Sequence, residues 1–313
     1  MDDRLNRPRG RLYGLLLCAG QGGKSVKALK TLDYRFRRYS GLRLSKHVFD
    51  ACWRWRSGNP YFEIRRYLYM GKELIRFDDF AKLSRYRSMI YNLFSRVFAR
   101  KVDREFLESL MSREIIDIIS GVCENEESSG KLTKTIRNIL SNSDKFFEVE
   151  REFEGLFVVP VNDRFIPPYI SYYLGNKSER INLEDVKGVD EGGVALVNKL
   201  ELLYKKLNFT LRDASEVSLK RADHISYILG FMAALVGLEE RHQPGQVKKQ
   251  LPFKEVISNE FSFFNEFIKN WINLFADEVA ERANSPFYVE MARLMQSFAS
   301  SEQSDLETLL LQN

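Results

Sequence analysis

The chain has 313 residues, of which 44% are hydrophobic and 29% charged, the composition of an ordinary soluble protein that can bury a substantial core. Its net charge of +5 is unevenly spread, because residues 1–69 hold 16 basic residues against 5 acidic ones and residues 70–313 hold 32 against 38. Three distant cysteines without a CxxC pair exclude a disulfide framework and a cysteine zinc site, and no apolar run approaches the roughly 20 residues that cross a bilayer. We therefore expect a cytoplasmic protein without membrane insertion, metal or cofactor.

Residues 1–74 are predicted to be a basic extension of uncertain structure. LYGLLLCAGQGGKSVKAL (12–29) places Lys24 and Ser25 at the end of a phosphate-loop pattern, but the first glycine of that pattern falls on Cys18. The arginines and tryptophans of CWRWR (52–56) could stack on bases or contact phosphates. Two alternative functions follow from this segment, nucleic-acid binding through its basic residues and nucleotide hydrolysis through Lys24.

From residue 75 onward the chain is predicted to be all-α, because apolar residues recur at three- and four-residue steps and no segment alternates as a strand does. Asp103 has the character of a helix N-cap, and GVCENEESSG (121–130) that of a flexible loop. A single multi-helix domain is expected over 75–301, followed by a polar tail, 302–313, that frays. The expected helices span 78–98, 103–121, 131–141, 193–207, 225–238, 253–283 and 286–300.

The segment 148–175 differs from its surroundings. Pro160, Pro167 and Pro168 remove backbone donors and disfavour helix in the residues before them, so 158–168 is predicted to be an ordered loop. The loop is preceded by four alternating glutamates and contains or precedes an aromatic cluster that is costly to leave in water. These residues are Glu148, Glu150, Glu152 and Glu154, and Phe165, Tyr169, Tyr172 and Tyr173.

Asp223 and His224 open the most apolar predicted helix of the chain. Adjacent residues on a helix point about 100° apart, so this aspartate does not orient this histidine as a general base. The three histidines form no i,i+4 pair, and GxSxG is absent, so we expect no catalytic residues and no helical zinc site. On the residues alone, Asp223 as the helix N-cap, with His224 in the first turn, is favoured over a functional role.

Five short elements, taken together, resemble the TorD/DmsD/NarJ family of redox-enzyme maturation chaperones, over about residues 75–300. They occur in the order and at the spacing typical of that family. The elements are Leu156-Phe157 with Pro160, Pro168-Tyr169-Ile170-Ser171, Asp223-His224, Trp271, and Pro286-Phe287-Tyr288. For Tyr172, Tyr173, Trp271, Phe287 and Tyr288 we expect core packing.

The resemblance implies an all-helical chaperone that is not an enzyme. It implies binding to the twin-arginine signal, or N-terminal segment, of the catalytic subunit of a molybdopterin-dependent oxidoreductase, which is held in its apo form until the cofactor is inserted, so that export is delayed. The sequence leaves a homodimer open, and nucleic acid is not the expected partner. The family's peptide site carries over to Phe157, Pro160, Pro168, Tyr169, Ser171, Asp223 and His224.

A signal segment of paired arginines and apolar residues needs an apolar groove and a carboxylate for the guanidinium. Asp223 is the first candidate for that carboxylate, and the run of glutamates at 148–154 is the second. The chain departs from the family in having Lys220 and Arg221 just before Asp223, and Val159 where a glycine is frequent. The two positive charges would oppose an arginine pair unless they point outward.

Overall fold

The computed structural model describes residues 77–122, 126–160, 163–174, 191–210, 221–240 and 253–312. All of these belong to the second of the two units into which the chain divides, Arg56–Asn313. The first unit, Met1–Trp55, lies outside the described residues. The predictions for the phosphate-loop pattern at Lys24 and for CWRWR therefore fall on residues that the structure does not describe.

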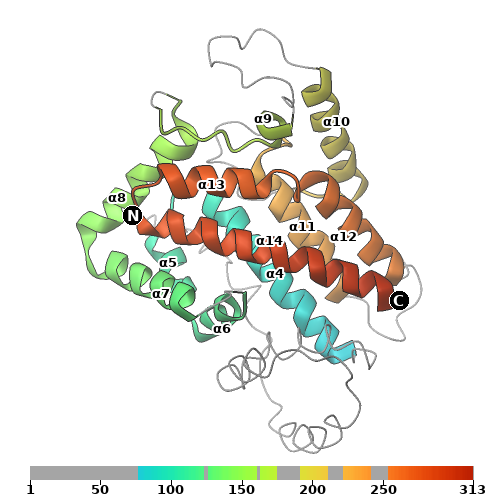
Figure 1. The fold of residues 1–313 in the computed structure, drawn as a ribbon, viewed down its shortest axis with the longest axis horizontal. Helices are drawn as coiled ribbons and strands as arrows, with labels where there is room; N and C mark the ends of the chain where they lie inside the picture. Colours follow the sequence, from blue (N-terminus) through green and yellow to red (C-terminus); the bar gives the residue numbers. More distant parts are fainter. Residues whose placement is uncertain are drawn as a thin grey trace, which may run out of the picture. The chain divides into compact units, whose positions relative to one another are not determined.

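Every regular element of the described residues is helical, which confirms the predicted all-α class. The helices drawn in Figure 1 are α4 (Phe77–Ala99), α5 (Arg104–Leu110), α6 (Arg113–Val122), α7 (Glu126–Ser141), α8 (Ser143–Phe153), α9 (Ile170–Leu174), α10 (Glu191–Lys206), α11 (Ile225–Glu240), α12 (Phe253–Phe267), α13 (Ile272–Arg282) and α14 (Pro286–Gln312). A π-helical turn, η1 (Glu154–Val158), continues α8 into the proline loop.

Helix α11 lies at the centre of the packing and makes its most extensive contact with α4. It is apolar almost all the way round, as a helix surrounded by other helices should be. Helix α12 packs against α11 and α14, and α14 runs beside α13 (Figure 1). The core predicted for Trp271, Phe287 and Tyr288 is confirmed, because all three side chains are fully buried.

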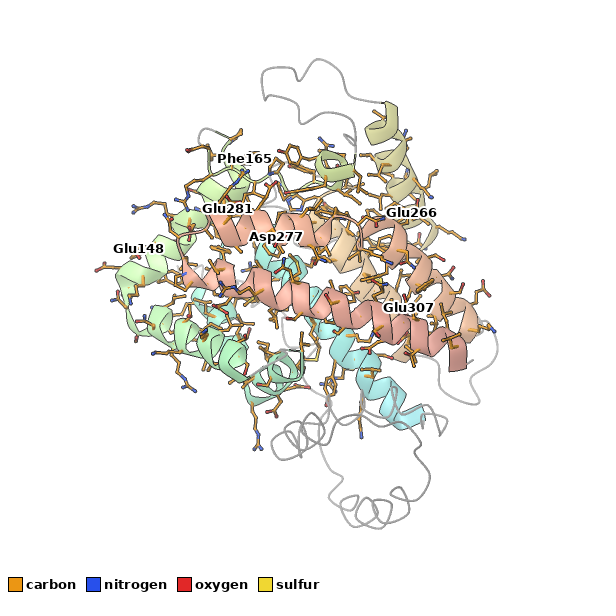
Figure 2. All side chains as sticks on the ribbon, in the orientation of Figure 1. Glu148, Phe165, Glu266, Asp277, Glu281 and Glu307 are labelled. Carbon is orange, nitrogen blue, oxygen red and sulfur yellow. The ribbon has the colours of Figure 1, made fainter. Side chains whose placement is uncertain are left out.

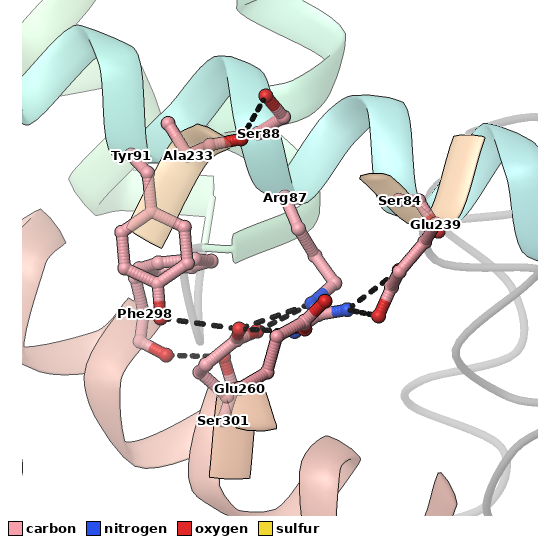
Figure 3. A network of polar contacts seen from close by, with 10 residues as sticks. Ser84, Arg87, Ser88, Tyr91, Ala233, Glu239, Glu260, Phe298 and Ser301 are labelled. Carbon is pink, nitrogen blue, oxygen red and sulfur yellow. Dashed lines mark hydrogen bonds and ion pairs between the residues drawn. The ribbon is translucent and has the colours of Figure 1, made fainter. Parts of the chain in front are cut away.

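A buried ion cluster joins four of these helices around Arg87 of α4 (Figure 3). The guanidinium donates to Glu239 of α11 at 2.9 Å, to Glu260 of α12 at 2.8 Å and to Glu302 of α14 at 2.7 Å. None of the four side chains is exposed to solvent. Because one cation faces three carboxyl groups, burial and the neighbouring Glu239 raise the pKa of Glu260 well above its usual value.

The helix starts predicted at Asp103 and Pro286 are confirmed. The Asp103 carboxylate accepts a hydrogen bond from the backbone N–H of Phe106 at 2.7 Å, so it caps α5. Helix α14 begins at Pro286, whose missing N–H costs nothing at the first helical position.

Two segments predicted as single helices are each broken in two. The helix expected over 103–121 is interrupted at Met111 and Ser112, where the Ser112 hydroxyl accepts from the N–H of Ile115. The helix expected over 253–283 is interrupted between α12 and α13. There the Trp271 indole donates to the carbonyl of Phe267 at 2.6 Å, which satisfies an acceptor that the interrupted helix leaves open.

The region before the proline loop, residues 121–153, is more helical than predicted. The expected flexible loop at 121–130 is wrong for most of its length, because α6 continues to Val122 and α7 already begins at Glu126. Two glutamates at the start of α7 suit the positive end of the helix dipole. Helix α8 was not predicted at all, although Asn142 caps it through the N–H groups of Asp144 and Lys145.

The expectation that residues 302–313 fray is also wrong. Helix α14 extends to Gln312, and four side chains of this polar stretch are buried. They are Glu302, Asp305, Leu306 and Leu309. The stretch is ordered because one face carries leucines at helical spacing and Glu302 completes the cluster around Arg87.

Glu152 of α8 ties the α13–α14 connection to the proline loop. Its carboxylate accepts from the N–H groups of Asn284 and Ser285 at 2.5 and 2.8 Å, and from Arg164 at 2.5 Å. We expect Glu152→Gln to lower the free energy of unfolding by about 1–2 kcal/mol, since the charge that strengthens these hydrogen bonds is removed. Urea titration followed by circular dichroism would measure this loss.

The matched control is Glu148→Gln, four residues earlier on the same helix, where the side chain is exposed (Figure 2). Its free energy of unfolding should stay within about 0.5 kcal/mol of the unsubstituted protein. Equal stabilities of the two variants would contradict a capping role for Glu152.

Candidate functional site

The proline loop and the turn before α11 are joined by backbone hydrogen bonds. The N–H of Ile225 donates to the carbonyl of Pro168 at 2.8 Å, and the N–H of Ile170 donates to the carbonyl of Asp223 at 3.0 Å. These two bonds form an antiparallel bridge between Tyr169 and His224. Five of the seven predicted site residues therefore lie in one place, Pro168, Tyr169, Ser171, Asp223 and His224.

The Asp223 carboxylate is completely buried and already holds a guanidinium. Arg221 donates from Nε to one carboxylate oxygen and from a terminal nitrogen to the other, both at 2.9 Å. The Ser171 hydroxyl donates to the second oxygen at 2.5 Å. The interpretation of Asp223 as the N-cap of α11 is therefore wrong, because its oxygens bind side chains instead.

His224 occupies the cap position in its place. Its Nδ1 accepts from the backbone N–H of Ser226 at 3.2 Å and lies 2.7 Å from the Ser226 hydroxyl. Burial lowers the pKa of His224 to about 4, although the nearby Asp223 opposes this shift in part. The imidazole is therefore neutral at physiological pH, where it acts as a hydrogen-bond acceptor and not as a sensor of protonation.

The ring of Tyr169 contacts two side chains of this turn, and other aromatic residues lie close to it in sequence. The Arg221 guanidinium carbon lies 4.7 Å from the centre of the Tyr169 ring, and the same ring meets His224 edge-on at 5.3 Å. Tyr173 stacks on Trp271 at 5.5 Å, whereas Tyr172 is 49% exposed. The predicted core packing thus holds for Tyr173 and is wrong for Tyr172, whose ring is available at the surface.

Phe157 and Pro160 do not join this cluster through any contact that we observe. Phe157 is buried in η1, where its ring meets Phe98, Phe153, Phe275 and Tyr288. Pro160 is exposed at the other end of the loop. Phe157 therefore supports the loop from beneath, and a direct contact with a ligand would require the core to open.

The run of glutamates at 148–154 does not form one acidic surface. Glu152 is used internally, as described above, and Glu154 forms an ion pair with Lys101 at 2.5 Å. Glu150 and Glu154 instead line a cavity of about 420 Å³ whose other charged residues are Arg100, Lys101 and Asp103. Since its cationic and anionic side chains nearly balance, this cavity is a poor match for a strongly basic segment.

Arg221 is the site residue whose role sequence reasoning missed. Its position two residues before Asp223 was a recognised departure from the family pattern, but a spacing of two in an unknown turn gives no side-chain direction. In the structure the Arg221 guanidinium points toward Asp223 and donates hydrogen bonds to its carboxylate. Lys220 lies outside the described residues.

Neither a metal site nor a membrane span is found in the ranges that the structure describes. No three histidine, cysteine, aspartate or glutamate side chains are grouped there so that they could hold a metal ion. No described helix combines the length and the apolar character needed to cross a bilayer.

Comparison with known proteins gives consistent matches. Residues 124–277 match a family model described as "Nitrate reductase delta subunit". The "Chaperone protein TorD" of Shewanella piezotolerans is 26% identical over 225 residues, which cover 71% of this chain and 92% of that protein. The protein of the same name from Vibrio vulnificus strain YJ016 is 23% identical over 215 residues, or 68% of this chain and 90% of its own length.

Proposed function

This chain belongs to the TorD-like family of maturation chaperones, and on that premise we propose that it binds the N-terminal, twin-arginine-type signal segment of a molybdopterin-dependent oxidoreductase. The client is the apo form of the catalytic subunit, which the chaperone holds in the cytoplasm until the cofactor is inserted. Export of the client is delayed for that time. The chaperone itself makes and breaks no covalent bonds.

The proposed binding site is the bridge between the proline loop and the turn before α11. Tyr169 offers an aromatic face, Ser171 a hydroxyl and Asp223 a carboxylate. Pro168 and His224 hold the two strands of the bridge in place through the backbone and through the cap of α11. Three prolines in the loop limit its freedom before binding, which reduces the entropy lost when a peptide binds.

The observation that supports this site most directly is the guanidinium already seated in it. Arg221 meets Asp223 with two parallel hydrogen bonds and lies over the Tyr169 ring. A carboxylate and a ring that hold one arginine side chain in this way have the geometry required for an arginine of a client. Arginine suits such a site better than lysine, because its planar group can bind both carboxylate oxygens at once.

We expect Asp223→Asn to weaken binding of a synthetic peptide with two adjacent arginines followed by an apolar stretch by about tenfold or more, since a hydrogen bond to a charged group contributes about 1.5–3 kcal/mol. The fold should survive, because the released Arg221 is 46% exposed and can be solvated. Isothermal titration calorimetry at low salt would measure the affinity.

Asp277→Asn provides the matched control, because Asp277 is an exposed carboxylate on α13 (Figure 2). Its affinity for the same peptide should equal that of the unsubstituted protein. Equal affinities of Asp223→Asn and Asp277→Asn would remove Asp223 from the site. Co-purification from the native host would test the client, which should be a molybdoenzyme catalytic subunit that lacks its cofactor.

A further inference from the structure

Arg221 and Asp223 differ sharply in their freedom to move. The Asp223 side chain has no exposed surface, and its backbone carbonyl is fixed by the N–H of Ile170. The Arg221 side chain is 46% exposed and is held by its guanidinium alone, through Asp223, Ser171 and the Tyr169 ring. If the pair separates, Arg221 is the partner that leaves.

The carboxylate cannot accept a second guanidinium while Arg221 is in place. Both of its oxygens are engaged by Arg221, one of them also accepts from Ser171, and neither reaches solvent. An incoming arginine must therefore take over the same hydrogen bonds. A lysine could replace only part of them, because an ammonium group does not span both oxygens.

Arg221 also solves a problem that the empty site would otherwise have. A buried carboxylate without a counter-charge is strongly destabilising, and it tends to bind a proton instead. With Arg221 in place, the buried Asp223 carboxylate has a counter-charge and three hydrogen bonds when no peptide is bound. The exchange of one guanidinium for another then costs little electrostatic energy, because the number of ion pairs is conserved.

We propose that Arg221 is a specificity-determining residue that occupies the arginine subsite of the empty chaperone and is displaced by an arginine of the client. This inference rests on the function proposed above. Because the resident group is tethered two residues away, it competes at an effective concentration in the millimolar range or higher. The site therefore rejects weakly matching segments and admits those that supply a guanidinium together with further apolar contacts.

The test compares two synthetic peptides, one with paired arginines before an apolar stretch and one with both arginines replaced by glutamine. Calorimetry is performed at the same pH, 8, for all variants. Arg221→Ala should bind the arginine peptide about tenfold tighter or more, because the competitor is gone. Binding of the glutamine peptide should not change.

Two further variants control for loss of the fold and for nonspecific effects of removing an arginine. Arg221→Lys retains a positive charge beside Asp223 and so protects the fold, and it should bind the arginine peptide with intermediate affinity. Arg293→Ala is the matched control, since Arg293 is a half-exposed arginine paired with the nearly buried Glu290 on α14. Its affinities should equal those of the unsubstituted protein.

Displacement can also be observed directly in the unsubstituted protein. The Nε–H resonance of Arg221, identified by its loss in Arg221→Lys, should move to the position of a free arginine when the arginine peptide is added. The glutamine peptide should leave it unchanged. An unmoved resonance in the saturated arginine complex would overturn the proposal.

The two hypotheses fail in different ways. If Asp223→Asn weakens binding but Arg221→Ala binds the arginine peptide no more tightly than the unsubstituted protein, the peptide site stands and the competitor role of Arg221 is refuted. If no form of the protein binds the arginine peptide, or if Asp223→Asn binds it unchanged, both the site and the competitor role are refuted.

Discussion

Replacing Arg87 by methionine should remove about 3–5 kcal/mol from the free energy of unfolding at pH 7.5, a large part of the 5–15 kcal/mol of a typical domain. Methionine fills a similar volume but leaves Glu239, Glu260 and Glu302 buried together without a cation. Urea titration at pH 7.5 and at pH 5.5 would measure the loss. It should be smaller at pH 5.5, because Glu260, whose pKa is already raised by burial and by Glu239, binds a proton there more readily.

A companion variant isolates the excess negative charge of this cluster. The pKa of Glu260 is raised by burial and by Glu239, so its folded form binds a proton more strongly than its unfolded form. The resulting stability is present below the unfolded pKa and is lost as the pH rises through the folded pKa. Glu260→Gln imitates the protonated form, so it should be tolerated at pH 7.5 and should reduce the fall in stability at higher pH.

Glu307→Gln is the control for both variants, because Glu307 is an exposed carboxylate on α14 (Figure 2). It should change neither the stability by more than about 0.5 kcal/mol nor its dependence on pH. A loss in Arg87→Met that is the same at pH 7.5 and 5.5 would show that packing, and not uncompensated charge, accounts for the effect.

Phe275→Ala should lower the free energy of unfolding by about 3–5 kcal/mol, through lost burial and the cavity left behind. The Phe275 ring is fully buried on α13 and contacts Phe98 at 5.1 Å, Trp271 at 6.0 Å, Phe157 at 6.1 Å and Tyr173 at 6.2 Å. Phe275 thereby connects Phe98 of α4 to Phe157, the residue that packs beneath the proline loop. Thermal and urea denaturation would measure the loss.

The neighbouring Leu274 provides a control on the same helix, because its side chain is 52% exposed. Leu274→Ala should change the free energy of unfolding by less than about 0.5 kcal/mol. If the two alanine variants were equally stable, the aromatic packing around Phe275 would be contradicted.

The helical period predicted the class of the fold well, and it did so because most helices have one buried face. It did not predict the breaks at Met111–Ser112 and Ile268–Trp271, since apolar residues keep their spacing across both of them. The ion cluster around Arg87 could not be predicted from the sequence, for a different reason. Its members are up to 215 residues apart in sequence, and each of them alone has the character of a solvated charge.

The proximity of two motifs of the candidate site was predicted, whereas the side-chain contacts between them were not. The motifs Pro168-Tyr169-Ile170-Ser171 and Asp223-His224 do lie together, as the family resemblance implied. The roles of the two residues differ from the prediction made from the residues alone. His224, and not Asp223, caps α11, while Asp223 binds the side chain of Arg221. The difference arises because α11 begins one residue later than an N-cap at Asp223 requires. Sequence patterns do not predict helix ends to within one residue.

The burial of Glu302 in the last helix has a consequence for biosynthesis. Arg87 is synthesised 215 residues before Glu302. A nascent chain that has not reached residue 302 therefore contains Arg87 without one of its three carboxylate partners. The cluster can therefore form only after residue 302 has left the exit tunnel of the ribosome. A chain that stops before residue 302 should accordingly lack the complete cluster, and cellular proteases should degrade it.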